Sequence, residues 1–371
     1  MTSVVIDTER MRMLHCGLGQ FCLHLGRGII DGAEGHLSPV FLMHPEHANY
    51  FGRAAISVLP VRRWNTEPYQ RFVRPWTRLL TSAPSYALWH TTHQDSKFLP
   101  ADPSVPVILT IHDLNFLREK SPASINRRIR RLQKKVDRAS VITTASHHAA
   151  KEIREQLAVG DRQIAIIPHG VCVDSMEVTH QKPSFLPPGR FLFTIGDVTR
   201  KKNFHVLLDL MEKVPDYRLV IAGQRSNEYA TNMERDIIRR SLKHRVILPG
   251  TVSNADRAWL YQHCDAFLFP STSEGFGLPV IEAMSFGRPV FCSDATSLPE
   301  VGGSLAFYWR QFDADHLANV FVQGMKTFTS DPCYGDKLRS HAAEFCWESA
   351  AKKYILLYEN IMQSPPRRQA A

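Results

Sequence analysis

The strongest constraint on the fold is the repeated alternation of short apolar segments with longer segments of helical period. Short strands that alternate with helices are typical of parallel sheets, because parallel neighbours must be joined by a crossover that covers one face of the sheet. The alternation occurs in two series, one on either side of a proline-rich stretch at 181–189. Strands are expected at 4–7, 87–90, 105–111, 141–143 and 164–167 in the first series, and at 191–195, 218–222, 245–248, 266–269 and 290–292 in the second.

The segments between the strands have helical character. Apolar residues at helical spacing predict helices at 21–30, 149–157, 203–214, 256–263 and 348–362, and a turn is expected at 17–20. We therefore predict an α/β protein of two doubly wound, Rossmann-like domains that face each other across a cleft. Ligands of such sheets bind outside the carboxyl ends of the strands.

The 371 residues are enough for two domains with separate cores. We expect an N-terminal domain at 1–180, a hinge at 181–190 and a C-terminal domain at 191–346. A closing helix at 347–363 is expected to pack back on the N-terminal domain, and a flexible tail follows at 364–371.

Composition favours a cytoplasmic protein. The sequence has 44% hydrophobic and 22% charged residues, which is ordinary for a globular protein. No apolar run approaches the roughly 20 residues of a membrane helix, and the first residues lack the features of a signal peptide. The 7 cysteines are scattered and form no C-x-x-C pair, which favours a reducing compartment.

A formal net charge of +9 favours anionic partners without choosing among metabolites, lipid surfaces and nucleic acid. Much of the excess lies in 127–138, where Ile129, Leu132 and Val136 recur at spacings of three and four. This pattern predicts an amphipathic helix with a basic face. A solvated surface helix and a helix on the anionic inner face of a membrane both fit. Few aromatic residues interleave the basic run, so we expect no nucleic-acid partner.

The segment at 273–282, with the sequence SEGFGLPVIE, carries most of the functional information. Pro279 suits the first position of a helix, and the glycines before it let the backbone come close to a ligand. The amides of the first helical turn then point outward beside the positive end of the helix dipole, which suits an anionic ligand. Glu274 and Glu282 are acceptors that can each hold a pair of sugar hydroxyls.

A second candidate segment, at 195–203, lies between a predicted strand and a predicted helix. It contains Gly196 and three consecutive cations, of which Lys201 and Lys202 are the last two. Cations at such a junction are costly to bury without partners, and a diphosphate would supply acceptor oxygens to the ammonium groups and to helix amides together. A solvated basic loop is the alternative for this segment taken alone.

Together, the two segments resemble glycosyltransferase family 4, a family of retaining enzymes with the two-domain GT-B fold and mannosyltransferase members. Glu274 and Glu282 match the family's two glutamates separated by seven residues, and 283–290 continue that motif. Weaker similarities lie at 17–20, 110–114, Ser146, 168–171 and 345–348, so the resemblance covers nearly the whole chain.

The resemblance implies that the C-terminal domain binds a nucleotide sugar. Glu282 would hold the ribose hydroxyls, and Glu274 would contact the transferred sugar. Lys202, helped by Lys201 and close to Gly196, would stabilise the departing diphosphate. The backbone amides of Phe276, Gly277 and Leu278 would bind sugar hydroxyls or phosphate.

One position departs from the family pattern. Some members place an arginine directly after the glycine that corresponds to Gly196, whereas this chain has Asp197. Phosphate binding must then depend on Lys201 and Lys202.

The N-terminal domain would bind the acceptor. Gly17 and Gly19 are similar to the family's acceptor-side glycine loop, and His112 would face the donor sugar as a catalytic group together with Glu274 and Lys202. His90 ends a predicted strand and is expected to line the cleft. A metal site at His90 and His93 is disfavoured because no third ligand is near. A nicotinamide cofactor is also disfavoured, because Cys22 replaces the third glycine of the fingerprint.

We therefore expect a retaining glycosyltransferase that needs no metal, with GDP-mannose favoured as donor and a UDP-sugar close behind. The acceptor would be a saccharide or a lipid-linked saccharide in polysaccharide or lipopolysaccharide assembly. A nucleotide-sugar epimerase of the same fold is an alternative, and so is a non-enzymatic nucleic-acid binder.

Overall fold

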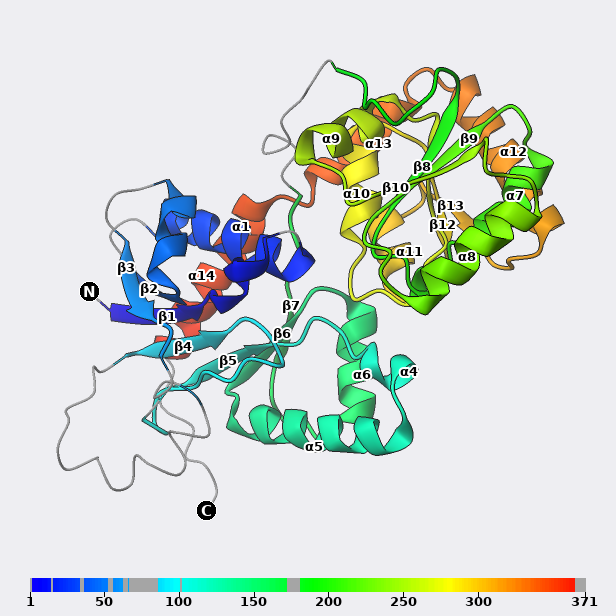
Figure 1. Cartoon of the computed structure of the whole chain (residues 1–371). Coiled ribbons are helices and arrows are strands. Elements are labelled where there is room, and N and C mark those ends of the chain that lie inside the picture. The colour runs from blue at the N-terminus through cyan, green and yellow to red at the C-terminus, as the bar shows by residue number, and fades with distance from the viewer. Residues whose placement is uncertain are drawn as a thin grey trace. The chain divides into compact units, whose positions relative to one another are not determined.

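The computed structural model describes residues 2–14, 16–33, 37–52, 56–62, 66, 86–100, 102–171 and 181–363 (Figure 1). Contacts divide the chain into two compact units. Unit 1 comprises Met1–Gly170 and Trp347–Ala371, and unit 2 comprises Val171–Cys346. The tail at 364–371 lies outside the described residues.

Unit 1 contains a seven-stranded parallel sheet in the order β3-β2-β1-β4-β5-β6-β7. The order reverses between β1 and β4, as it does in doubly wound sheets. The strands are β1 (Thr2–Asp7), β2 (Leu37–Met43), β3 (Ser57–Pro60), β4 (Leu88–Thr91), β5 (Val107–Thr110), β6 (Val141–Thr144) and β7 (Ile164–Ile166).

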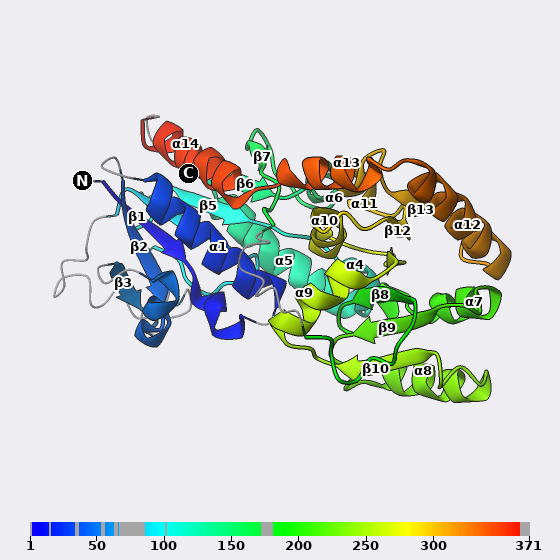
Figure 2. The same cartoon turned by 90° about the horizontal axis from the view of Figure 1, so that it is seen from above.

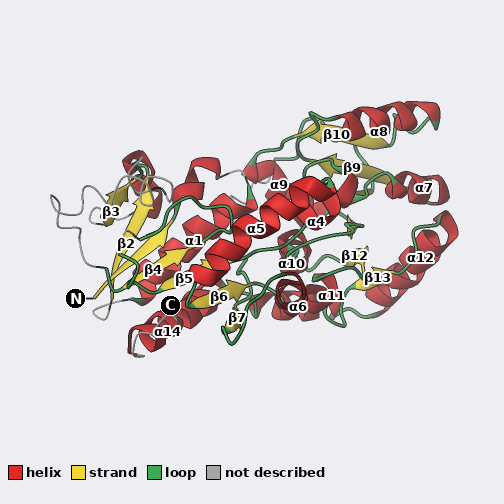
Figure 3. Cartoon of the chain, turned by 90° about the horizontal axis from the view of Figure 1, so that it is seen from below, coloured by secondary structure: helices red, strands yellow, loops and turns green. Residues whose placement is uncertain are grey.

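Helices cover both faces of this sheet, because right-handed crossovers that run in opposite directions along a sheet lie on opposite faces (Figures 2 and 3). The crossover from β1 to β2 carries α1, and the crossover from β5 to β6 carries α5. The helices of unit 1 are η1 (Glu9–Met13), α1 (Gly17–Gly32), η2 (Pro45–Phe51), α4 (Phe116–Glu119), α5 (Pro122–Arg138), α6 (His147–Gln156) and α14 (Trp347–Gln363).

The C-terminal helix α14 packs against α1. A Cβ atom on Gly28 of α1 would lie 2.7 Å from the Cβ atom of Ala351 and 3.2 Å from the carbonyl oxygen of Trp347. Only glycine permits so close an approach of the two helices at this point. Helix α14 is therefore part of the core of unit 1.

Unit 2 contains a six-stranded parallel sheet in the order β10-β9-β8-β11-β12-β13, which reverses between β8 and β11. Its strands are β8 (Phe191–Ile195), β9 (Arg218–Ala222), β10 (Val246–Gly250), β11 (Ala266–Phe269), β12 (Val290–Ser293) and β13 (Phe307–Trp309). Its helices are η4 (Arg200–Lys202), α7 (Val206–Lys213), α8 (Glu228–Arg239), α9 (Asn254–His263), α10 (Leu278–Ser285), α11 (Leu298–Gly302), α12 (Ala314–Ser330) and α13 (Tyr334–Ala343).

The prediction of two Rossmann-like α/β units is confirmed. Three of the described strands, β2, β3 and β13, were not predicted. β2 contains Pro39 and is only half buried, and β3 is a short strand at the edge of its sheet. β13 has three residues. The expected turn at 17–20 was wrong, because these residues form the first turn of α1.

Candidate functional site

The two candidate segments of unit 2 lie side by side at the point where the strand order reverses. Residues 196–203 follow β8, and residues 270–277 follow β11, so both leave the carboxyl ends of neighbouring strands. The carbonyl oxygen of Lys201 joins them, because it accepts hydrogen bonds from the amide of Thr272 at 2.8 Å and from the hydroxyl of Thr272 at 3.1 Å. The backbone of the basic segment is therefore fixed to the loop that carries Glu274.

Lys202 and Glu274 form an ion pair in which Nζ lies 2.5 Å from Oε1. Both side chains are largely buried, with 13% and 14% of their surface exposed. Ser271 donates a second hydrogen bond to the same carboxylate oxygen at 2.6 Å, and the ammonium lies 4.7 Å from the centre of the Phe269 ring. These contacts compensate for the loss of hydration around both charges.

Gly196 makes room for the lysine. Its φ of 148° lies in a region that favours glycine, and a Cβ atom there would lie 3.1 Å from Cε of Lys202. The side chain of Lys202 thus passes directly over the backbone of Gly196.

The start of α10 is held in a strained conformation. Gly277 caps the helix with a φ of 120°, and Pro279 is the second residue of α10, one place after the predicted first position. Ser297 donates to the carbonyl of Phe276 at 2.7 Å, and Thr296 accepts from the amide of Glu274 at 3.0 Å. Thr296 has a φ of 54°, which is unfavourable for a β-branched residue and marks a position over-determined by its surroundings.

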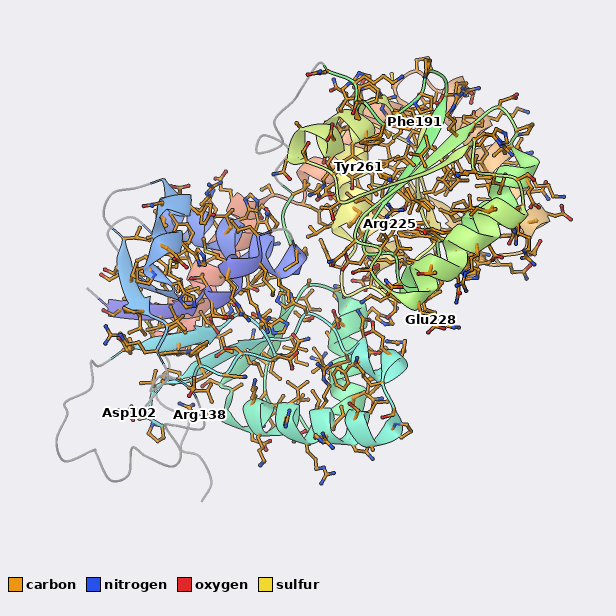
Figure 4. All side chains as sticks on the ribbon, viewed as in Figure 1. Asp102, Arg138, Phe191, Arg225, Glu228 and Tyr261 are labelled. Atoms are coloured by element: carbon orange, nitrogen blue, oxygen red, sulfur yellow. The ribbon has the colours of Figure 1, made fainter. Side chains whose placement is uncertain are left out.

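The second glutamate of the motif has its own partners. Glu282 lies in α10 and is 7% exposed. Its Oε1 atom forms a salt bridge with Arg257, and its Oε2 atom accepts a hydrogen bond of 2.7 Å from the hydroxyl of Tyr261. Arg257 and Tyr261 both belong to α9, and Tyr261 is labelled in Figure 4.

In unit 1, His112 follows β5 and is buried. Its Nε2 atom lies 2.9 Å from the carbonyl oxygen of Thr92, and its Nδ1 atom lies 3.3 Å from Nε2 of His169. Burial lowers the pKa of His112 to about 4. The ring is therefore neutral at pH 7, with Nε2 donating to Thr92 and Nδ1 accepting from His169.

Gly17 and Gly19 lie in the first turn of α1. A Cβ atom on Gly19 would lie 2.2 Å from the carbonyl oxygen of Met13, so this glycine is required by the close approach of η1. Gly17 has no atom within 4 Å of the position its Cβ atom would take. The space around Gly17 is open in unit 1, whereas that around Gly19 is filled.

The expected position of His90 was wrong. The side chain is 0% exposed, and its two ring nitrogens lie 2.7 Å from the hydroxyl of Tyr358 and 2.8 Å from that of Thr110. A histidine enclosed in this way cannot line a cleft. It instead connects α14 to the sheet of unit 1.

The structure thus gathers Gly196, Lys201, Lys202, Glu274 and the start of α10, including Phe276, Gly277 and Leu278, at one edge of unit 2, with Glu282 further along the same helix. The sequence did not predict the residues that hold this group in place. Ser271, Thr296 and Ser297 contact Glu274 or Phe276, but they belong to no recognisable sequence motif. Arg257 and Tyr261 are four residues apart in a predicted helix, a spacing that places them on one helical face, but the sequence does not show which residue that face meets.

Within the described ranges, no three His, Cys, Asp or Glu side chains are grouped so that they could hold a metal ion. The helices described there include none that is long and apolar enough to cross a membrane.

Comparison with known proteins identifies two family models. Residues 17–175 match the model described as Glycosyltransferase Family 4, and residues 175–325 match the model described as Glycosyl transferases group 1. The two matches are adjacent and together extend from α1 to α12.

Several curated relatives are mannosyltransferases. The serotype-specific mannosyltransferase WbdA of Escherichia coli is 27% identical over 251 residues, which are 63% of this chain and 30% of WbdA. The chain therefore aligns with less than a third of the length of that relative. The O-antigen chain mannosyltransferase RfbU of Salmonella typhimurium is 26% identical over 324 residues, which are 82% of this chain and 86% of RfbU.

Solved structures share the fold across almost the whole chain. Sucrose-phosphate synthase from Thermosynechococcus elongatus superposes with a TM-score of 0.74 at 17% identity, covering 97% of this chain and 99% of the other. HepE from Anabaena, solved in complex with UDP and glucose, superposes with a TM-score of 0.72 at 16% identity, covering 97% and 100%. These similarities confirm the GT-B fold.

Proposed function

The chain belongs to glycosyltransferase family 4, and we propose that it is a retaining hexosyltransferase that transfers a sugar from a nucleotide diphosphate to a saccharide or lipid-linked acceptor. The observation that carries the proposal is the grouping of Lys202 and Glu274 at the carboxyl ends of β8 and β11, with Glu282 on the helix that follows. Ligands of doubly wound sheets bind where the strand order reverses, and that is where this group lies.

Lys202, helped by Lys201, is proposed to bind the diphosphate. The positive end of α10 and the amides of Phe276, Gly277 and Leu278 add further donors. As the sugar–phosphate bond breaks, negative charge grows on the diphosphate, and fixed positive groups stabilise that charge more strongly than they stabilise the intact donor. We propose that these groups make a catalytic metal unnecessary.

The two glutamates are proposed to bind the two sugars of the donor. Glu274 accepts hydrogen bonds from the transferred hexose, and Glu282 accepts them from the ribose. Glu274 is already fixed by Lys202 and Ser271, so its free lone pairs have a defined direction before the donor arrives. Such preorganisation reduces the cost of ordering the site on binding.

His112 is the proposed catalytic group of unit 1. Positive charge develops at the anomeric carbon during transfer, and a neutral imidazole does not oppose that charge as an imidazolium would. The low pKa of His112, caused by burial, keeps the ring neutral. Retention of configuration is proposed to follow from attack on the face that the diphosphate leaves, with a phosphate oxygen taking the proton of the acceptor hydroxyl.

We propose a mannosyl donor, GDP-mannose, because the relatives WbdA and RfbU are named as mannosyltransferases. A UDP-sugar is the second candidate, since HepE of the same fold was solved with UDP and glucose. Because RfbU is named for the O-antigen chain, the proposed pathway is the assembly of a lipopolysaccharide or a related surface polysaccharide.

The basic helix α5 is proposed to meet an anionic membrane surface through charge alone. Its apolar residues Leu132 and Val136 are buried in the core cluster that contains Leu109 and Ile142, so they cannot insert into lipid without unfolding unit 1. Its exposed residues include Arg127, Arg130, Arg131 and Lys134, which are spaced to lie on one side of the helix. Such a stripe attracts anionic lipid by roughly 1 kcal/mol per cation.

The test of the proposed function is a transfer assay with GDP-mannose and UDP-sugars, with and without a saccharide acceptor. We expect acceptor-dependent release of nucleotide in the wild type and its loss in Glu282→Ala. Wild-type turnover in that variant would contradict the site. Conversion of the donor to another sugar nucleotide without acceptor would favour an epimerase instead.

A further inference from the structure

Arg257 and Tyr261 lie on the same side of α9 and both reach Glu282. The two helices meet because the crossovers from β10 to β11 and from β11 to β12 run in the same direction along the sheet, which places α9 and α10 on one face. Residues four apart on a helix are neighbours on its surface, so one face of α9 supplies both partners of the glutamate.

The two partners use different oxygens of the carboxylate. Tyr261 bonds Oε2 and Arg257 bonds Oε1. A carboxylate has about four lone-pair positions, two on each oxygen. One position on each oxygen is therefore left for a ligand, and two acceptors on neighbouring oxygens match two hydroxyls on neighbouring carbons.

Both partners keep the protons they donate. Tyr261 is completely buried, and burial raises its pKa well above the ordinary value, so the hydroxyl stays protonated. Burial lowers the pKa of Arg257, but the charge of Glu282 and the hydrogen bonds to Glu282 and Tyr261 together raise it by more, so the guanidinium stays charged. The Nε atom of Arg257 is buried and has no hydrogen-bond partner among the described residues. Among the described residues, Arg257 therefore contacts the Glu282 carboxylate without a further hydrogen bond through Nε.

The rings around Tyr261 fix the direction of its hydroxyl. Phe286 stacks on the tyrosine with ring centres 5.8 Å apart, and Phe193 meets it edge-on at 5.0 Å. A ring packed in this way cannot turn to follow a carboxylate that moves. The carboxylate must instead take the orientation that the tyrosine imposes.

We propose that Arg257 and Tyr261 are positioning residues that orient Glu282 toward the 2′- and 3′-hydroxyls of a ribonucleotide, so that the site distinguishes ribonucleoside diphosphates from their 2′-deoxy forms. This inference rests on the proposed function, because it takes the ligand to be a nucleotide sugar. Without Tyr261 only Arg257 holds the carboxylate, so Oε2 loses its fixed direction and the second hydroxyl loses a fixed acceptor.

The proposal is tested by titration calorimetry with GDP, UDP and their 2′-deoxy forms. The wild type is expected to bind the ribonucleotide about tenfold or more tightly than its 2′-deoxy form, as the loss of a hydrogen bond to a charged group implies. In Tyr261→Phe we expect that ratio to fall below about threefold, through weaker binding of the ribonucleotide, with the 2′-deoxy form almost unchanged. Tyr308→Phe is the matched control, because it removes a hydroxyl that bonds the carbonyl of Gly303 at 2.6 Å in the same unit.

A second variant separates positioning from folding. Arg257→Ala removes the group that holds Oε1 of Glu282, so the preference for the ribonucleotide over its 2′-deoxy form should fall below about threefold, and Arg257→Lys should restore part of it. A fold defect alone would weaken the binding of both nucleotides equally.

The outcomes distinguish the inference from the function on which it rests. A wild type that binds neither GDP nor UDP would contradict the proposed function. A wild type that binds them without a preference for the ribonucleotide would overturn the role of Arg257 and Tyr261 alone. The same holds if the preference stays unchanged in Tyr261→Phe and in Arg257→Ala.

Discussion

The Nζ atom of Lys202 lies 2.5 Å from Oε1 of Glu274, so these two opposite charges of the proposed donor site neutralise each other. A diphosphate must therefore share Lys202 with the glutamate or displace it. The pair holds both side chains in place, and the ammonium is also adjacent to the ring of Phe269. The proposed site is thus preorganised, at the cost of a competing internal partner.

Lys202→Ala is expected to lower turnover by about 10²–10³-fold, because it removes the cation proposed to stabilise the leaving diphosphate. Steady-state transfer assays measure the effect. Lys213→Ala is the control, since Lys213 forms an exposed ion pair with Asp315 at 2.7 Å in the same unit. Exposed ion pairs contribute little to stability, so the control should keep wild-type turnover. Equal turnover in both variants would remove Lys202 from the mechanism.

Gly277→Ala is expected to weaken nucleotide binding and to lower the free energy of unfolding by about 1–3 kcal/mol. The backbone at Gly277 has a φ of 120°, and a Cβ atom would lie 2.7 Å from Leu298. Gly250→Ala has a similar backbone cost, with a φ of 84°, but its Cβ atom would meet nothing within 4 Å. Denaturant unfolding should show a loss in both variants, whereas calorimetry should show weaker nucleotide binding only in Gly277→Ala. Unchanged binding in Gly277→Ala would mean that the start of α10 does not contact the ligand.

Acid should destabilise unit 1. Burial lowers the pKa of His90 to about 3, of His93 to about 2 and of His112 to about 4. Burial also lowers the pKa of His169 well below its ordinary value, so these four rings stay neutral in the folded state near pH 5. Near pH 5 the unfolded chain binds protons at these histidines and the folded chain does not, so stability rises with pH up to about 6.5. Asp7 acts in the opposite sense, because burial raises its pKa to about 6.

Four histidine protons against one aspartate proton leave a net difference of three, which is a slope of about 4 kcal/mol per pH unit near pH 5. Denaturant titrations at pH 4.5–7 measure the slope. Asp7→Asn removes the one proton that opposes the histidines, so the slope of stability against pH should become steeper by about 1.4 kcal/mol per pH unit. A shallower slope in that variant would contradict the assignment of Asp7.

Charge reversal on α5 tests the membrane proposal. Replacing Arg127, Arg130, Arg131 and Lys134 with glutamate should abolish flotation with vesicles that contain phosphatidylserine, and raised salt should release the wild type. Arg154→Glu, on α6 of the same unit, is the control, and it should leave flotation almost unchanged. Flotation that survives both the substitutions and high salt would show that another surface holds the protein to lipid.

The sequence was most informative where function and local structure coincide. The strands β8, β9 and β11 begin and end at the predicted residues, because each is a short apolar run bounded by polar turns. Pro279 correctly predicted that a helix starts near this residue, because the proline ring fixes φ at a helical value.

The rest depends on contacts between distant parts of the chain. The pairing of Arg257 with Glu282 follows from the direction of two crossovers, which no local pattern encodes. His90 was misplaced for the same reason. A histidine at a strand end is typical of a ligand site, and only the packing of Tyr358 from the last helix shows that it is enclosed.

The central claim is that a nucleotide diphosphate binds between Lys202 and the start of α10, with Glu282 on its ribose. The most direct measurement is a crystal structure of the protein with GDP or UDP. The claim predicts diphosphate oxygens within about 3 Å of the Lys202 ammonium and both ribose hydroxyls on the Glu282 carboxylate. A nucleotide bound elsewhere, with the Lys202–Glu274 pair and Glu282 untouched, would contradict it.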